Sequence, residues 1–208
     1  AGDIASGQIF EEMTFNDKYP GIDPITGRNL SPTYFPSISS GFATNSRVVL
    51  PKLNLSRVFV LSTGGTASAS EAFINGLRGI DVQVVLIGDN TRGKPYGFYG
   101  IDNCGTTYFT IQFKGSNAKG FGEYSDGFIP SSVDNMYGSE VLGCRAADDL
   151  NHLLGDRNER LFGAALQFIQ TGRCPENSVA ADRLPQKTRQ PYASGDLLAP
   201  ELPGRVMQ

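Results

Sequence analysis

Two short segments hold residue types that could carry out covalent chemistry. Ser68 lies in the segment STGGTASASE (residues 62–71), and Lys94 lies in the segment GDNTRGKP (residues 88–95). A serine hydroxyl becomes a nucleophile when a base removes its proton, and a lysine can be that base when its amine is desolvated. Because the chain has one histidine, His152, a lysine base is favoured over a serine–histidine pair. The predicted chemistry is acyl transfer, with Ser68 as nucleophile and Lys94 as general base.

The elements that must position these segments are predicted from apolar patterns. Residues 57–61 (RVFVL) are a β-branched and aromatic run before two glycines, which predicts a buried strand. Residues 68–77 carry apolar side chains at three- and four-residue spacing, typical of a helix packed on a sheet. Residues 82–88 (VQVVLIG) predict a second strand, covered on both faces. Together they predict a parallel β-α-β unit with both segments at the edge where α/β folds bind ligands.

Ser68 is expected at the corner between the first strand and the helix. There its hydroxyl would lie near the positive end of the helix dipole and near unpaired backbone N–H groups, which stabilise developing negative charge. The glycines and alanines around it would let a substrate backbone approach. Serines before helices are most often N-caps, so it is the pair of segments that favours catalysis. Ser70 and Glu71 are interpreted as first-turn helix residues, since a carboxylate there suits the dipole.

The segments TASASE (residues 66–71) and TRGK (residues 91–94) resemble the paired motifs of the C-terminal processing (tail-specific) serine peptidases, in the family's order and approximate spacing. The resemblance covers residues 55–100 strongly and extends loosely to residue 175. It implies an α/β, ClpP/crotonase-like core in which β-β-α units wind into a superhelix. It also implies that Ser68 is the nucleophile, Lys94 the general base and the Ala69 backbone N–H an oxyanion donor, with no metal or cofactor.

The chain departs from the family pattern in three places. The second oxyanion donor of the family comes from a glycine-rich strand end upstream, and residues 1–10 have no such form. Four residues after the lysine, where the family commonly has a glutamine that orients it, this sequence has Phe98. The usual upstream peptide-binding domain is absent from the 208 residues. Two alternatives therefore stay open: a non-catalytic peptide- or ligand-binding module on the same fold, and an esterase-like acyl hydrolase.

The rest of the chain is predicted to add to this core. Residues 11–57 are rich in Pro, Gly, Ser, Thr and Asn and predict an irregular insertion. Residues 106–113 and 121–128 alternate in character and predict an antiparallel hairpin. Residues 146–170 predict a helix that stops at Thr171-Gly172.

These segments predict one domain over residues 1–175, with added antiparallel strands, and a Pro-rich C-terminal tail over residues 176–208. The resemblance implies that this domain is a peptidase catalytic domain, truncated at its N-terminus. The start, Ala1-Gly2-Asp3-Ile4, is typical of a cut inside a larger protein. We therefore expect upstream domains in the same precursor.

The composition is typical of one soluble domain that can bury a sizeable core: 208 residues, 39% apolar, with a formal net charge of −3. A pI near 5.2 and the lack of a basic stripe argue against a nucleic-acid partner. No apolar run approaches the roughly 18 residues that span a bilayer. The expected partner is a protein or peptide substrate, and the resemblance suggests the bacterial cell envelope, in the periplasm or exported.

The three cysteines, Cys104, Cys144 and Cys174, lack C-x-x-C spacing, which together with a single histidine argues against a zinc site. Cys144 and Cys174 flank a predicted helical segment, and a disulfide between them is as plausible as two free thiols. His152 stands among aspartates and is interpreted as part of a polar helix start rather than as a metal ligand.

Overall fold

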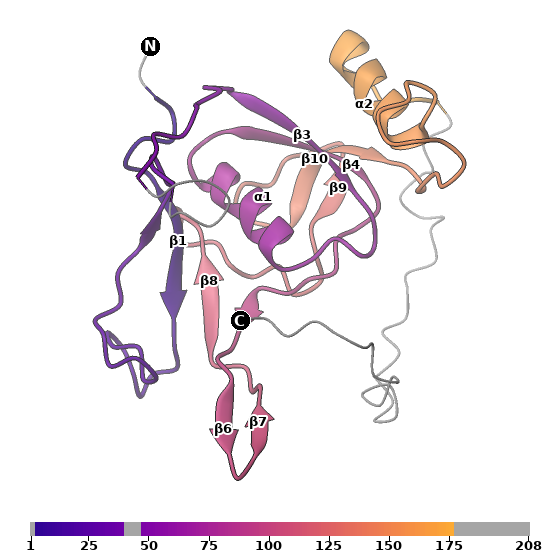
Figure 1. Cartoon of the computed structure of the whole chain (residues 1–208). Coiled ribbons are helices and arrows are strands. Elements are labelled where there is room, and N and C mark those ends of the chain that lie inside the picture. Colours follow the sequence, from indigo (N-terminus) through magenta and orange to yellow (C-terminus); the bar gives the residue numbers. More distant parts are fainter. Residues whose placement is uncertain (1–2, 40–46, 177–208) are drawn as a thin grey trace.

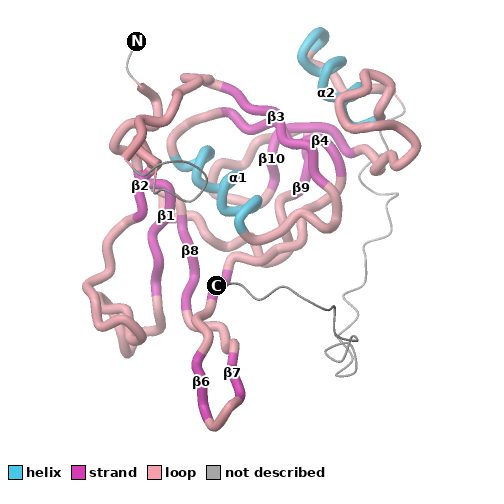
Figure 2. Tube along the Cα trace, in the orientation of Figure 1, coloured by secondary structure: helices cyan, strands magenta, loops and turns pink. Residues whose placement is uncertain are grey.

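The computed structural model describes residues 3–39 and 47–176, which form two sheets, two helices and a projecting hairpin (Figures 1 and 2). The elements in chain order are β1 (Ile9–Thr14), β2 (Thr33–Tyr34), β3 (Arg57–Ser62), α1 (Ala69–Gly79), β4 (Gln83–Gly88), β5 (Tyr96–Gly97), β6 (Ile101–Asn103), β7 (Thr106–Tyr108), β8 (Phe113–Ser116), β9 (Ile129–Ser131), β10 (Glu140–Arg145) and α2 (Arg160–Thr171). Neither described helix has the length and apolar character needed to cross a membrane.

One sheet is parallel, with the strand order β3-β4-β10-β9. β3 and β4 pair along their whole length, ending with Ser62 opposite Gly88. The strands predicted at residues 57–61 and 82–88 are confirmed to within one residue. Because parallel strands end at the same edge, the loops that follow Ser62 and Gly88 leave the sheet together.

A helix covers each face of this parallel sheet, and β4 has apolar side chains on both of its faces. Val84 and Leu86 belong to the core cluster under α1, whereas Val85 and Ile87 pack on the other face against α2. A strand that is covered by helices on both faces is typical of parallel sheets. The predicted α/β class and β-α-β unit are therefore confirmed, while the repeating β-β-α superhelix stays a prediction.

The second sheet is antiparallel, with the order β2-β1-β8-β5. The strands β1 and β2 correct the prediction that residues 11–57 are irregular throughout. The first part of β1 pairs with β2, and its last part pairs with β8 from Glu12 opposite Ser116 to Thr14 opposite Lys114. The run IFEEMT lacks the alternation that marks a strand, and one of its two partners, β8, lies far along the chain. Added antiparallel strands are confirmed, and β5 directly follows the Lys94 segment.

The predicted hairpin between residues 106–113 and 121–128 is wrong. β7 instead pairs with β6 in a two-stranded hairpin that projects from the body (Figure 1), and β8 pairs with β1 and β5. Residues 121–128 form a loop that buries its aromatic side chains under α1. These side chains are Phe121, Tyr124 and Phe128. The alternation along residues 121–128 predicts a strand, but these side chains reach the core from irregular backbone.

The helix predicted over residues 146–170 begins only at Arg160. Before it, carboxylates accept backbone N–H groups locally: Asp149 from Asn151 at 3.0 Å and Asp156 from Asn158 at 2.9 Å. Such local bonds compete with helix formation. The predicted stop is confirmed, since Gly172 ends α2 in the left-handed conformation.

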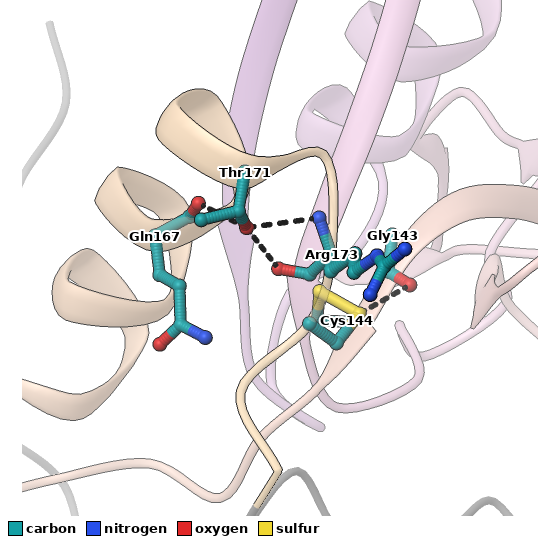
Figure 3. Close-up of a disulfide and its surroundings, with 6 residues drawn as sticks. Gly143, Cys144, Gln167, Thr171 and Arg173 are labelled. Carbon is teal, nitrogen blue, oxygen red and sulfur yellow. Dashed lines mark hydrogen bonds between the residues drawn. A yellow bond between two sulfur atoms is a disulfide. The ribbon is translucent and has the colours of Figure 1, made fainter.

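A disulfide joins Cys144 in β10 to Cys174 after α2, and settles the pairing that the sequence left open (Figure 3). It ties the chain after α2 to the sheet that α2 covers. Cys104 is a free, exposed thiol at the turn between β6 and β7. From residue 177 onward, the predicted C-terminal tail lies outside the described residues.

Candidate active site

Ser68 is exposed at the N-cap of α1, in the corner that follows β3. The turn before it is closed by Thr66, whose hydroxyl accepts the Thr63 N–H at 3.0 Å and whose N–H donates to the Thr63 carbonyl at 2.9 Å. N-cap residues normally have extended backbone with negative φ. Ser68 instead has φ 54° and ψ −114°. Strained backbone of this kind clusters at functional sites.

Ala69, the predicted oxyanion donor, is the first residue of α1 and is exposed. The N–H groups of a helix's first turn have no partner inside the helix, and the positive end of the dipole lies there. The Ala69 N–H can therefore stabilise negative charge that develops beside the Ser68 side chain.

The loop after β4 is hydrogen-bonded to the serine turn. The Arg92 N–H donates to the Thr66 carbonyl at 2.8 Å. On its other side the loop is anchored to the core, because the Thr91 N–H donates to the Phe128 carbonyl at 3.0 Å. The structure thus brings together the two segments that the sequence paired.

Lys94 lies in this loop and is exposed. The residue before it must be glycine: Gly93 has φ +83°, and a Cβ there would overlap the Ser125 carbonyl oxygen. This close backbone approach sets the direction in which the chain presents Lys94. Ser68 and Lys94 are therefore both accessible at the carboxyl edge of the parallel sheet.

Glu71 joins the two segments through its side chain, which is fully buried. Its Oε2 accepts the backbone N–H of Ser68 at 2.9 Å and that of Lys94 at 2.8 Å. Its Oε1 accepts the Thr91 hydroxyl and the Gly93 N–H, both at 2.6 Å. One carboxylate thus connects the Ser68 turn to the Lys94 loop.

Sequence reasoning placed Glu71 in the first helical turn and missed this connection. The Ser-x-x-Glu spacing from Ser68 predicts a capping box, in which the glutamate accepts the serine N–H. No local pattern shows the donors from residues 91–94. The negative charge of Glu71 also affects a tyrosine in the core. Burial has the largest effect on Tyr124, and the negative charges of Glu11 and Glu71 add to it, so that the pKa of Tyr124 lies far above its usual value.

The other candidates lie elsewhere or lack the needed chemistry. His152 places its Nδ1 2.8 Å from an Asp149 oxygen, and that same oxygen accepts the N–H of Arg160 at the start of α2. His152 therefore belongs to the opposite face of the sheet from α1. Among the described residues, the aspartates around it form no group that could hold a metal ion. Phe98 is exposed and packs edge-on against Phe109, with ring centroids 5.7 Å apart, so it offers the lysine no polar partner.

Comparison with known proteins finds similarity to a solved structure but no match to a sequence family. No family model matches the chain, and no curated protein matches it. A solved structure named "Putative S41 protease", from Bacteroides fragilis NCTC 9343, matches with a TM-score of 0.60 and 22% identity over 83% of this chain. The match spans 39% of that protein's length. This likeness shows a shared fold.

Proposed function

We propose that this chain belongs to a serine endopeptidase that hydrolyses peptide bonds in unfolded proteins or peptide ends, with Ser68 as nucleophile and Lys94 as general base. The observation that carries the proposal is the meeting of the two motifs at Glu71, whose Oε2 accepts the N–H groups of Ser68 and Lys94. The paired motifs and the fold shared with a protein named as an S41 protease support the same family of reactions.

The reaction proceeds by acyl transfer. The neutral Lys94 amine takes the proton of the Ser68 hydroxyl while Oγ attacks the scissile carbonyl carbon. The Ala69 N–H donates to the oxyanion of the tetrahedral intermediate. When the intermediate collapses, the lysine ammonium gives its proton to the leaving amine. Water, activated by the same amine, then hydrolyses the acyl-enzyme and frees Ser68.

The exposure of Lys94 implies a covered state during catalysis. A lysine acts as a base only when neutral, and desolvation favours the neutral amine. We propose that bound substrate, or a domain upstream in the same precursor, covers Lys94 when the reaction takes place. Export to a bacterial envelope, where Cys144 and Cys174 would oxidise, agrees with the disulfide and forms part of this proposal.

The test is hydrolysis of a casein-like unfolded protein by the full-length precursor. Ser68→Ala and Lys94→Ala should each reduce the rate to background. Ser70→Ala and Lys119→Ala are the matched controls: Ser70 is exposed in the first turn of α1, and Lys119 pairs with Asp81. Both controls should retain wild-type rates. Undiminished hydrolysis by Ser68→Ala would refute the assignment.

A non-catalytic binding module is the second candidate, and the exposure of Lys94 and the apolar Phe98 favour it. A fluorophosphonate probe, which reacts with activated serines, distinguishes an enzyme from a non-catalytic binding module. Labelling that Ser68→Ala abolishes supports an enzyme, and cleavage of a p-nitrophenyl ester without cleavage of casein would make it an esterase. Binding of an unfolded peptide with neither labelling nor hydrolysis would establish the binding module.

A further inference from the structure

We infer that Glu71 is a positioning residue whose carboxylate holds the Ser68 turn and the Lys94 loop in one geometry, and so sets the separation of nucleophile and base. The inference rests on the proposed function of Ser68 and Lys94. It goes beyond that function because Glu71 touches neither substrate nor reacting atoms and acts through the backbone.

The contacts of Glu71 exceed what a helix cap requires. A capping box accounts only for the Ser68 N–H. The other three donors come from residues 91–94, on the loop after β4. An ionised carboxylate has about four acceptor positions, so the four donors occupy all of them. Hydrogen bonds to a charged acceptor are also roughly twice as strong as neutral ones.

Glu159 shows what a purely structural buried glutamate looks like in the same chain. It is 3% exposed and caps α2, accepting the N–H groups of Leu161 at 2.9 Å and Phe162 at 2.7 Å. Both of its donors belong to its own helix, whereas Glu71 collects donors from two segments. Glu159 is therefore the matched control for Glu71.

The buried charge of Glu71 is balanced by hydrogen bonds rather than by a cation. Among the described residues, none of the ion pairs includes Glu71. A buried charge without a charged partner is costly unless donors surround it. Removing any donor, or replacing an oxygen by an N–H group, therefore disturbs the whole arrangement.

Thr91 extends the connection to the core. Its hydroxyl donates to Glu71 Oε1 at 2.6 Å and accepts the Phe128 N–H at 2.7 Å. Phe128 is fully buried under α1. The lysine loop is thus held between the serine turn on one side and the core on the other, with Glu71 and Thr91 as the linking side chains.

Glu71→Gln is the central variant, because glutamine keeps the shape but turns an amide NH2 toward two of the donors. We expect kcat on an unfolded-protein substrate to fall about 100-fold with KM within about twofold, since a 1 Å misplacement of catalytic groups costs about that factor. Glu159→Gln should leave kcat unchanged. A folded Glu71→Gln protein with wild-type kcat would overturn the inference.

Amide hydrogen exchange tests the coupling without relying on activity. In Glu71→Gln, the Gly93 and Lys94 N–H groups should exchange at least about 10-fold faster than in wild type, since their acceptor is disturbed. In Glu159→Gln the increase should be confined to Leu161 and Phe162. If the wild type hydrolyses nothing, the proposed function fails, and exchange still decides whether Glu71 holds the two loops together. Unchanged exchange at Gly93 and Lys94 would refute that coupling.

Thr91 supplies a second pair of variants if Glu71→Gln does not fold. Thr91→Val removes the hydroxyl at similar volume, whereas Thr91→Ser keeps it. We expect Thr91→Val to lower kcat about 10-fold and to speed exchange at Gly93, and Thr91→Ser to restore both toward wild type. Equal effects of valine and serine would show that Thr91 acts by packing alone and would count against the positioning role.

Discussion

Ser68 combines an exposed hydroxyl with a backbone conformation that serine rarely adopts. At φ 54° and ψ −114° it lies outside the extended region of ordinary N-caps. Such positions cost about 1–3 kcal/mol and persist where neighbouring contacts enforce them. The hydrogen bond from the Ser68 N–H to Glu71 is one such contact. The backbone conformation of Ser68 thus lowers the stability of the fold and holds the Ser68 hydroxyl in a defined direction.

Comparison of Ser68→Gly with Ser68→Ala measures this strain. Both variants lack the Ser68 hydroxyl, but glycine adopts positive φ without a Cβ clash. At an ordinary N-cap, glycine is favoured over alanine by about 1 kcal/mol. Here we expect the free energy of unfolding of Ser68→Gly to exceed that of Ser68→Ala by at least about 2 kcal/mol in urea denaturation. A difference of about 1 kcal/mol or less would show that the corner is unstrained.

The sequence predicted where the catalytic candidates would stand, and the structure confirms that their loops meet. A serine after one strand and a lysine after the next parallel strand must come to the same edge. The role of Glu71 could not be predicted, because three of its four donors lie on another loop. Their convergence depends on how that loop bends at Gly93, which no spacing in the sequence shows.

At the scale of elements, the β3-α1-β4 unit was predictable because its apolar runs are unbroken and glycines bound them. The wrong hairpin and the late start of α2 share a physical cause: side-chain contacts override the local sequence pattern. Aromatic residues of the loop 121–128 reach the core without forming a strand. Asp149 and Asp156 accept hydrogen bonds from nearby backbone N–H groups, and α2 therefore begins only at Arg160.

Asp149 makes the start of α2 sensitive to acid. The Asn151 N–H first, and then His152 and the Arg160 N–H, hold the pKa of Asp149 below its usual value against a smaller effect of desolvation. A lowered folded-state pKa contributes stability above the unfolded pKa, and this is lost as pH falls through the folded value. The melting temperature of wild type should therefore exceed that of Asp149→Asn at about pH 5, and the gap should close toward about pH 2. A gap that stays constant over that range would rule out a charge effect.

At the scale of the whole molecule, the disulfide and the candidate site belong to opposite faces of the parallel sheet. Cys144 and Cys174 pack with Ala164 and Ala165 of α2, whereas α1 covers the other face. The bond therefore stabilises the layer that does not hold Ser68.

Replacing both cysteines by serine should separate stability from activity. The bond closes a loop with a sequence separation of 30, for which chain entropy predicts about 3–4 kcal/mol. We expect the free energy of unfolding to fall by about that amount in urea, while the rate of hydrolysis well below the melting temperature stays near wild type. Loss of hydrolysis by the folded double variant would show that the α2 face is coupled to the site.

The antiparallel sheet also determines the order in which strands can pair while the chain is synthesised on the ribosome. The strands β3 and β4 lie close in sequence and can pair early, but Thr14 of β1 must wait for Lys114, a hundred residues later. At about 5–20 residues per second, synthesis leaves β1 without its β8 partner for about 5–20 s. During that time the edge of β1 that later pairs with β8 is open to pairing with other chains, which makes this strand the part of the nascent chain most exposed to misassembly.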